Sequence, residues 1–120
     1  MSRMKVLIVD DSTYIRKTIR TTLEDSGCEV IGEASDGETA IDLTHEHLPE
    51  LITLDNILPD MNGMDVLKAL RKSNIDAKVI MISAIGQESS RREADELGVS
   101  EYLIKPIDHN NLKEIISKIK

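Results

Sequence analysis

The sequence of 120 residues is poor in aromatic side chains, with two Tyr, no Trp and no Phe. Proteins that bind single-stranded nucleic acid stack bases on aromatic side chains, and this composition excludes such a platform. Basic charge is also in deficit, because 15 Lys and Arg face 22 Asp and Glu and leave a net charge of −7. Nonspecific binding to nucleic acid or to an anionic membrane requires a basic face, so we expect neither partner.

Cysteine and long apolar runs are scarce as well. The single Cys28 cannot form an internal disulfide, and together with the lack of a signal peptide it predicts a cytoplasmic protein. The apolar runs are far shorter than the ~20 residues that a membrane span needs. Hydrophobic residues make up 40% and charged residues 31% of the chain, which is typical of a globular domain. We therefore expect one domain, residues 1–120, and a monomer.

Short β-branched runs alternate with helical patterns along the chain. The runs at residues 6–9, 51–54 and 79–82 are apolar on both faces, which is typical of central parallel strands. The more polar run 29–34 favours an edge strand, and 102–104 is the fifth run. The segments between and after these runs predict helices, and the mostly charged stretch 88–97 is the fourth of them. This alternation predicts an α/β fold of the (βα)5 type, a doubly wound parallel five-stranded sheet.

Polar residues stand at the ends of four of the predicted strands. Asp10 and Asp11 follow the first strand, Asp55 the third, Ser83 the fourth and Lys105 the fifth. Taken singly, each residue is typical of a helix cap, a turn or a strand end. Ligands of doubly wound sheets bind at the carboxyl ends of the strands, so we expect these side chains to meet at one edge.

Three carboxylates at one edge predict a metal ion. Neighbouring carboxylates repel each other by about 4 kcal/mol at 4 Å and an effective dielectric constant near 20, and Lys105 supplies only one compensating charge. Mg2+ prefers oxygen ligands, and no His or Cys lies at these strand ends to favour zinc or copper. We expect Asp10 and Asp11 to hold Mg2+. The solitary Asp55 would attack phosphorus, while Lys105 and Ser83 would bind phosphoryl oxygens.

These motifs together resemble those of the receiver domains of two-component response regulators, and most closely those of stand-alone, CheY-like receivers. The resemblance spans essentially all 120 residues and implies the flavodoxin-like strand order 2-1-3-4-5. The matching motifs are residues 6–11 (VLIVDD), Asp55 with Leu58-Pro59 and Asn62-Gly63 downstream, Ser83-Ala84, and Lys105-Pro106.

The resemblance implies that Asp55 accepts a phosphoryl group from a CheA-like histidine kinase, with Mg2+ as cofactor. The implied metal ligands are three carboxylates and one main-chain oxygen, namely those of Asp10, Asp11, Asp55 and the carbonyl of Ile57. Lys105 is the implied phosphate-binding lysine, and the implied peptide bond before Pro106 is cis. Such a chain is not a conventional enzyme, because it catalyses only its own phosphorylation and dephosphorylation.

The resemblance also implies a switch and an output surface. Ser83 is the switch hydroxyl, and Tyr102 is the aromatic side chain that turns inward as Ser83 moves to the phosphoryl group. Ile57 and Ile85 flank the path of the hydrolytic water, and because both are bulky and apolar we expect slow self-dephosphorylation and a separate phosphatase. With no effector domain, output is expected from a motor or adaptor protein, in chemotaxis or motility, through the fourth helix, fifth strand and fifth helix.

Two other readings of the receiver pattern stay open. One is a phosphorelay intermediate that passes its phosphoryl group to a histidine on another protein, and the other is a docking module that is never phosphorylated. A hydrolase of the haloacid-dehalogenase type would need Asp-x-Asp, whereas Ser12 stands two residues after Asp10. A flavodoxin would need a hydroxyl-rich phosphate loop after the first strand, where this chain has two carboxylates.

Overall fold

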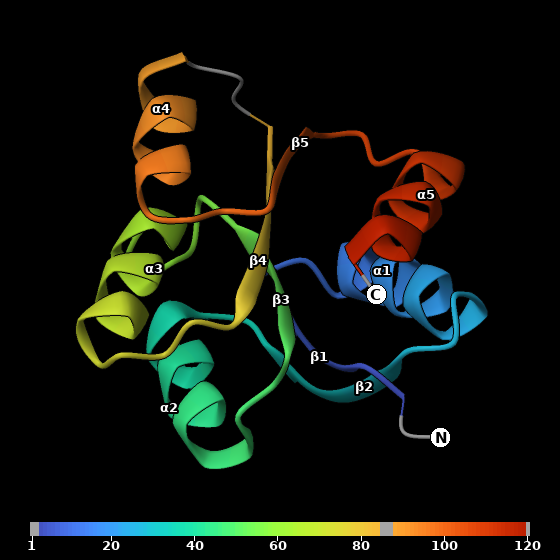
Figure 1. Cartoon of the computed structure of the whole chain (residues 1–120), viewed down its shortest axis with the longest axis horizontal. Coiled ribbons are helices and arrows are strands. Elements are labelled where there is room, and N and C mark those ends of the chain that lie inside the picture. The colour runs from blue at the N-terminus through green and yellow to red at the C-terminus, as the bar shows by residue number, and fades with distance from the viewer. Residues whose placement is uncertain (1–2, 85–87, 120) are drawn as a thin grey trace.

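The computed structural model describes residues 3–84 and 88–119. Its strands and helices alternate along the chain as predicted (Figure 1). The strands are β1 (Lys5–Val9), β2 (Glu29–Ala34), β3 (Leu51–Asp55), β4 (Lys78–Ser83) and β5 (Glu101–Ile104). The helices are α1 (Thr13–Asp25), α2 (Gly37–His47), α3 (Gly63–Lys72), α4 (Glu88–Glu96) and α5 (His109–Ile119).

The strands form one parallel sheet in the order β2-β1-β3-β4-β5, which confirms the predicted order. Figure 1 shows α1 and α5 on one face of the sheet and α2, α3 and α4 on the other. Side chains of each strand alternate between these faces, so Val6 and Ile8 pack on the α1 and α5 side while Leu7 and Val9 pack on the opposite side. Because helices cover both faces, β1, β3 and β4 are continuous apolar runs in the sequence.

The helix starts follow from local chemistry. Ser12 caps α1, with its Oγ accepting a hydrogen bond from the Ile15 N–H at 3.2 Å. Asp36 caps α2 in the same way, with its Oδ1 2.7 Å from the Thr39 nitrogen. In both cases a short polar side chain before the helix satisfies an otherwise unpaired N–H group. Within the described residues, no helix is long and apolar enough to cross a membrane.

The edge strand β2 differs from the centre of the sheet as the sequence predicts. Strand β2 is mostly half-buried, whereas all five residues of β3 are buried. The charged helix α4 also forms, and the methyl group of Ala94 is fully buried beneath it. Because the strands are parallel, the carboxyl ends of β1, β3, β4 and β5 lie at one edge of the sheet. The polar residues identified in the sequence lie at or just after these strand ends.

Candidate functional site

The first part of the site is the corner between β1 and α1. Asp10 follows the last residue of β1, and its side chain is 1% exposed, whereas Asp11 is exposed. The Asp10 Oδ1 accepts a hydrogen bond from the Ser12 N–H at 2.9 Å. Because Ser12 also caps α1, the chain turns directly from strand to helix here. The turn buries the first carboxylate and leaves the second at the rim.

The second part is the loop from β3 to α3. Asp55 ends β3 with 5% exposure, and its Oδ1 accepts from the Ile57 N–H at 3.3 Å. The loop returns so closely that the Gly63 N–H donates to the Asn56 carbonyl at 2.8 Å. A Cβ atom at position 63 would lie 2.3 Å from the Asp55 carbonyl oxygen. Only glycine fits there, which accounts physically for the Asn62-Gly63 motif.

Lys105 joins these two parts from the end of β5. Its Nζ lies 2.8 Å from the Asp10 Oδ2 and 3.3 Å from the Asp55 Oδ2. Burial alone would lower the pKa of Lys105, but the hydrogen bond and charge of Asp10, together with those of Asp55, outweigh burial and raise it. Lys105 therefore remains an ammonium group at neutral pH. The Lys105–Pro106 peptide bond is cis, as predicted.

The carboxyl group of Asp55 is the electrostatically disfavoured member of the cluster. Burial raises its pKa above the ordinary value of 3.8, and the negative charge of Asp10 raises it further. The Ile57 N–H and Lys105 lower the pKa in the opposite direction without cancelling these effects. A cation placed beside Asp55 would therefore relieve a cost that this fold carries.

A divalent cation fits the geometry of this edge. Asp10, Asp11 and Asp55 each offer one carboxylate oxygen, and these three oxygens all lie within 4.8 Å of one another. The cluster carries three negative charges against the single ammonium of Lys105, and its donors are all oxygens. Hard oxygen donors with a net negative charge are what Mg2+ requires. The three aspartates would hold the ion, and the remaining positions would be open to water and a phosphoryl oxygen.

The structure describes three of the four remaining predicted site residues, namely Ser83, Ile57 and Tyr102. Ser83 ends β4 and is fully buried, and its carbonyl accepts the Lys105 N–H at 2.8 Å. The Ile57 side chain is 49% exposed in the loop after Asp55. Tyr102 is buried against the α4 side of the sheet, with the Arg91 guanidinium carbon 5.7 Å from its ring centroid. Ile85 lies outside the described residues.

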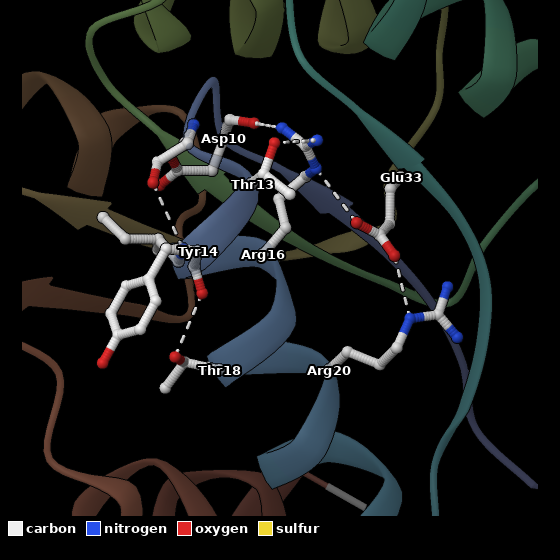
Figure 2. A network of polar contacts seen from close by, with 9 residues as sticks. Asp10, Thr13, Tyr14, Arg16, Thr18, Arg20 and Glu33 are labelled. Atoms are coloured by element: carbon white, nitrogen blue, oxygen red, sulfur yellow. Dashed lines mark hydrogen bonds and ion pairs between the residues drawn. The ribbon is translucent and has the colours of Figure 1, made fainter.

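A set of charged residues behind Asp10 was not predicted from the sequence. Figure 2 shows Arg16 between the Asp10 carbonyl and Glu33, and Arg20 on the other oxygen of Glu33. Two signals in the sequence were available. Arg16 and Arg20 are four residues apart and thus share one face of α1. Glu33 is an acidic residue near the end of β2, the strand that also begins with Glu29.

Asp60 was not predicted from the sequence either, although it fixes the loop that follows Asp55. Its two carboxylate oxygens accept the N–H groups of Gly37 at 2.7 Å and Glu38 at 3.0 Å. These bonds lower the pKa of Asp60, as expected for a carboxylate at a helix N-terminus. The loop after β3 is in this way attached to the start of α2, a contact that no local pattern predicts.

The chain also matches known proteins over nearly its whole length. The model of the response regulator receiver domain matches residues 6–117. The chemotaxis protein CheY of Bacillus subtilis is 36% identical over 114 residues, 95% of each chain. CheY of Thermotoga maritima is 35% identical over 115 residues, 96% of each chain.

Solved structures agree with these sequence matches. A chain in the CheX–CheY–BeF3–Mg2+ complex of Borrelia burgdorferi superimposes with a TM-score of 0.92 and 30% identity. The superposition covers 97% of this chain and 88% of that chain. Agreement over the whole sheet and all five helices, and not over one motif, is what a shared fold and ancestry require. The chain is therefore a member of the response regulator receiver domain family.

Proposed function

We propose that this receiver domain is a phosphorylation-dependent switch in which a carboxylate oxygen of Asp55 accepts a phosphoryl group. The observation that carries the proposal is the sharing of one edge by three carboxylates and one ammonium group. One oxygen each of Asp10, Asp11 and Asp55 lies within a 4.8 Å cluster, and Lys105 reaches two of these side chains. The edge thus combines a nucleophile, a place for Mg2+ and a cation for a phosphoryl oxygen.

The proposed donor is a phosphohistidine of a histidine kinase. In the transfer, an Asp55 oxygen forms the new bond to phosphorus while the P–N bond breaks, and its electron pair remains on the donor imidazole. Lys105 then moves its pairing from the Asp55 carboxylate to a phosphoryl oxygen, and the Ser83 hydroxyl donates to another. When bound, Mg2+ would neutralise charge on the carboxylates and the phosphoryl oxygens. The similar complex from Borrelia burgdorferi contains Mg2+ and BeF3, which supports this assignment.

The donor needs a surface on which to approach a buried carboxylate. A groove of about 570 Å3 runs beside the site between α1 and the segment after β5. Tyr14 and Ile15 of α1 and Pro106 and Ile107 after β5 contribute to its lining, and Lys105 lines it as well. We propose that the phosphohistidine-bearing partner packs here, because apolar side chains around a charged site exclude water from the transfer.

The phosphorylated state should be long-lived without a separate phosphatase. Hydrolysis needs a water molecule aligned with the phosphorus atom, and a polar side chain usually orients such a water. The half-exposed side chain beside Asp55 is that of Ile57, which can neither donate nor accept a hydrogen bond. Ile85 has the same chemistry at the second position implied by the family pattern.

The output is proposed to be altered binding of a motor or adaptor protein at the α4–β5–α5 face. The relatives named chemotaxis proteins support a role in motility. Ser83 and Tyr102 lie on neighbouring paired strands, with Ser83 opposite Ile104 and Tyr102 opposite Met81. A displacement at the end of β4 would therefore also move β5, the strand that carries Tyr102. We expect this movement to change the α4–β5–α5 face.

The proposal is tested by phosphorylation with acetyl phosphate in the presence and absence of Mg2+. We expect the wild type and the control Asp42→Asn, which alters an exposed carboxylate on α2, to be labelled only with Mg2+. Asp55→Asn should remain unlabelled. Labelling of Asp55→Asn, or equal labelling of the wild type after chelation of Mg2+, would contradict the proposal.

Titration with beryllofluoride and Mg2+ separates the switch from a docking module. We expect NMR amide shifts at Ser83, α4 and β5 in the wild type and none in Asp55→Asn. A chain that serves only for docking would show no response in either protein. A phosphorelay intermediate would respond to beryllofluoride as well. After phosphorylation with acetyl phosphate, however, it would pass its label to a histidine phosphotransfer protein and not retain it.

A further inference from the structure

The side chain of Arg16 leaves α1 and turns back toward the acidic corner (Figure 2). It is 16% exposed and donates to three different partners. Its Nη1 lies 2.6 Å from the Asp10 carbonyl oxygen, its Nε 2.9 Å from the Glu33 Oε1, and its Nη2 3.3 Å from the Thr13 Oγ1. A single planar group thus joins β2, the β1–α1 corner and the first turn of α1.

The carbonyl that Arg16 binds belongs to the peptide unit between Asp10 and Asp11. Strand β1 ends one residue earlier, and its last pairs are Val9 with Leu54 on β3 and with Ala34 on β2. The Asp10 N–H still donates to the Ala34 carbonyl at 3.0 Å. The Asp10 main chain is therefore held by β2 through its N–H group and by Arg16 through its carbonyl group.

Glu33 keeps the guanidinium group of Arg16 in its place. One oxygen of Glu33 accepts from Arg16, and the other lies 2.8 Å from the Arg20 Nε. The carboxylate is thus fixed between two guanidinium groups and belongs to a strand of the sheet. Through Glu33, Arg16 is held against β2. Its bond to the Asp10 carbonyl then restricts the movement of the peptide unit after Asp10.

We infer that Arg16 is a positioning residue for the metal site. By fixing the Asp10–Asp11 peptide unit, it sets the directions in which both carboxylates leave the main chain. The inference rests on the proposed function, because it requires Mg2+ to bind at the acidic cluster. Partners that orient metal ligands in this way commonly change metal affinity when they are removed.

Charge and positioning predict opposite effects for the loss of this guanidinium group. If Arg16 acted only through its charge, its removal would make the site more negative, and Mg2+ would bind more tightly. If Arg16 holds the ligands in place, its removal weakens Mg2+ binding despite the more negative site. The direction of the change in affinity therefore distinguishes the two roles.

The test is a Mg2+ titration of the full chain by isothermal titration calorimetry and by the NMR amide shifts of Asp10 and Asp11. We expect Arg16→Met to raise the Mg2+ Kd about tenfold. Arg16→Lys should also weaken binding, because an ammonium group keeps the charge but cannot serve three partners with a rigid fork. The matched control Arg20→Met removes an equal charge and a Glu33 contact without touching Asp10, and it should stay within about twofold of the wild type.

Urea unfolding in Mg2+-free buffer shows whether each variant is folded, and Arg16→Lys decides the question if Arg16→Met is not. The inference is overturned if Arg16→Lys binds Mg2+ within about twofold of the wild type, or if a folded Arg16→Met binds it as tightly or more tightly. Failure of the wild type to bind Mg2+ has a different meaning, because it overturns the proposed function and with it the premise of this inference.

Discussion

Asp10 and Asp55 share one lysine, yet their surroundings differ. The Asp10 side chain makes two short contacts, at 2.8 Å to Lys105 and 2.9 Å to the Ser12 N–H. The corresponding contacts of Asp55, to Lys105 and to the Ile57 N–H, both measure 3.3 Å. Shorter charge-assisted hydrogen bonds are stronger. Burial also raises the pKa of Asp55, so the fold stabilises the charged carboxylate of Asp10 more strongly than that of Asp55.

This difference matches the two roles that we propose for Asp10 and Asp55. A ligand that holds a metal should be fixed before the metal arrives, whereas a nucleophile should gain new interactions when phosphorus approaches. Asp10 has the first set of properties and Asp55 has the second. Asp10 and Asp55 therefore share Lys105 but differ in how tightly each is held, and Asp11 is exposed beside them.

Removal of Lys105 should produce the largest change in stability. Lys105→Met leaves the buried carboxylates of Asp10 and Asp55 without their shared cation. We expect the free energy of unfolding to fall by about 2–3 kcal/mol in Mg2+-free buffer, somewhat less than for a fully buried pair because the lysine reaches the surface. Urea unfolding measures this loss, and saturating Mg2+ should restore part of it.

The control for this variant is Lys118→Met, which breaks an exposed i,i+4 pair with Glu114 at 3.5 Å. Exposed pairs of this kind contribute little to stability, so no clear loss is expected. Equal losses in the two variants would show that Lys105 does not compensate the acidic cluster in the way the distances indicate.

Substitution of Ile57 tests the Asp55 side of the pair alone. Ile57→Gln places an amide beside the phosphorylated carboxylate, where it can orient a water molecule. We expect the phosphoryl group to be lost about tenfold faster, which corresponds to about 1.4 kcal/mol of barrier. The measurement is the decay of labelled protein in Mg2+ buffer, with Ile57→Leu as the apolar control. Decay of the wild-type label within seconds would show that an apolar side chain at this position does not slow hydrolysis.

Asparagine substitutions at positions 55 and 10 test whether the two buried carboxylates contribute differently to stability. Asp55→Asn removes a buried charge with long contacts, so we expect a gain of roughly 1 kcal/mol in the Mg2+-free free energy of unfolding, a typical single-site effect. Asp10→Asn relieves similar repulsion but loses the 2.8 Å bond to Lys105, so its gain should be smaller. Urea unfolding of both variants decides the order. An equal or larger gain for Asp10→Asn would remove the distinction between the two residues.

The smallest expected effect is the pH dependence of this gain. The pKa of Asp55 is raised in the folded chain, so the folded state binds a proton more readily than the unfolded state. The stability contributed by Asp55 is therefore fully present below its unfolded pKa and is lost as the pH rises through its folded pKa. Consequently, the advantage of Asp55→Asn over the wild type should shrink as the pH falls from 7 toward 4.

Unfolding curves of the wild type and Asp55→Asn at several pH values in Mg2+-free buffer measure this dependence. A constant difference between the two proteins across the range would place the origin of the gain in packing and not in charge. Asp42→Asn should run parallel to the wild type, because that exposed carboxylate lies outside the cluster.

The patterns in the sequence were sufficient to predict the fold and the gathering of Asp10, Asp11, Asp55 and Lys105 at one edge. Apolar runs buried on both faces define β1, β3 and β4, and Ser12 and Asp36 begin their helices through local hydrogen bonds. Once the strands are parallel, the residues after them must meet at one edge. The proximity of Asp10, Asp55 and Lys105 follows from that rule, because it depends only on where each strand ends.

The way in which these groups are connected depends on the packing of the elements against one another. The unequal division of Lys105 between Asp10 and Asp55, the three contacts of Arg16, and the hydrogen bonds from Asp60 to α2 are set by tertiary packing. Arg16 and Glu33 are 17 residues apart, and Asp60 lies 23 residues from Gly37. Periodicity describes neighbours within one helix or strand, whereas a contact between elements depends on how they pack and on the direction in which each side chain leaves the backbone.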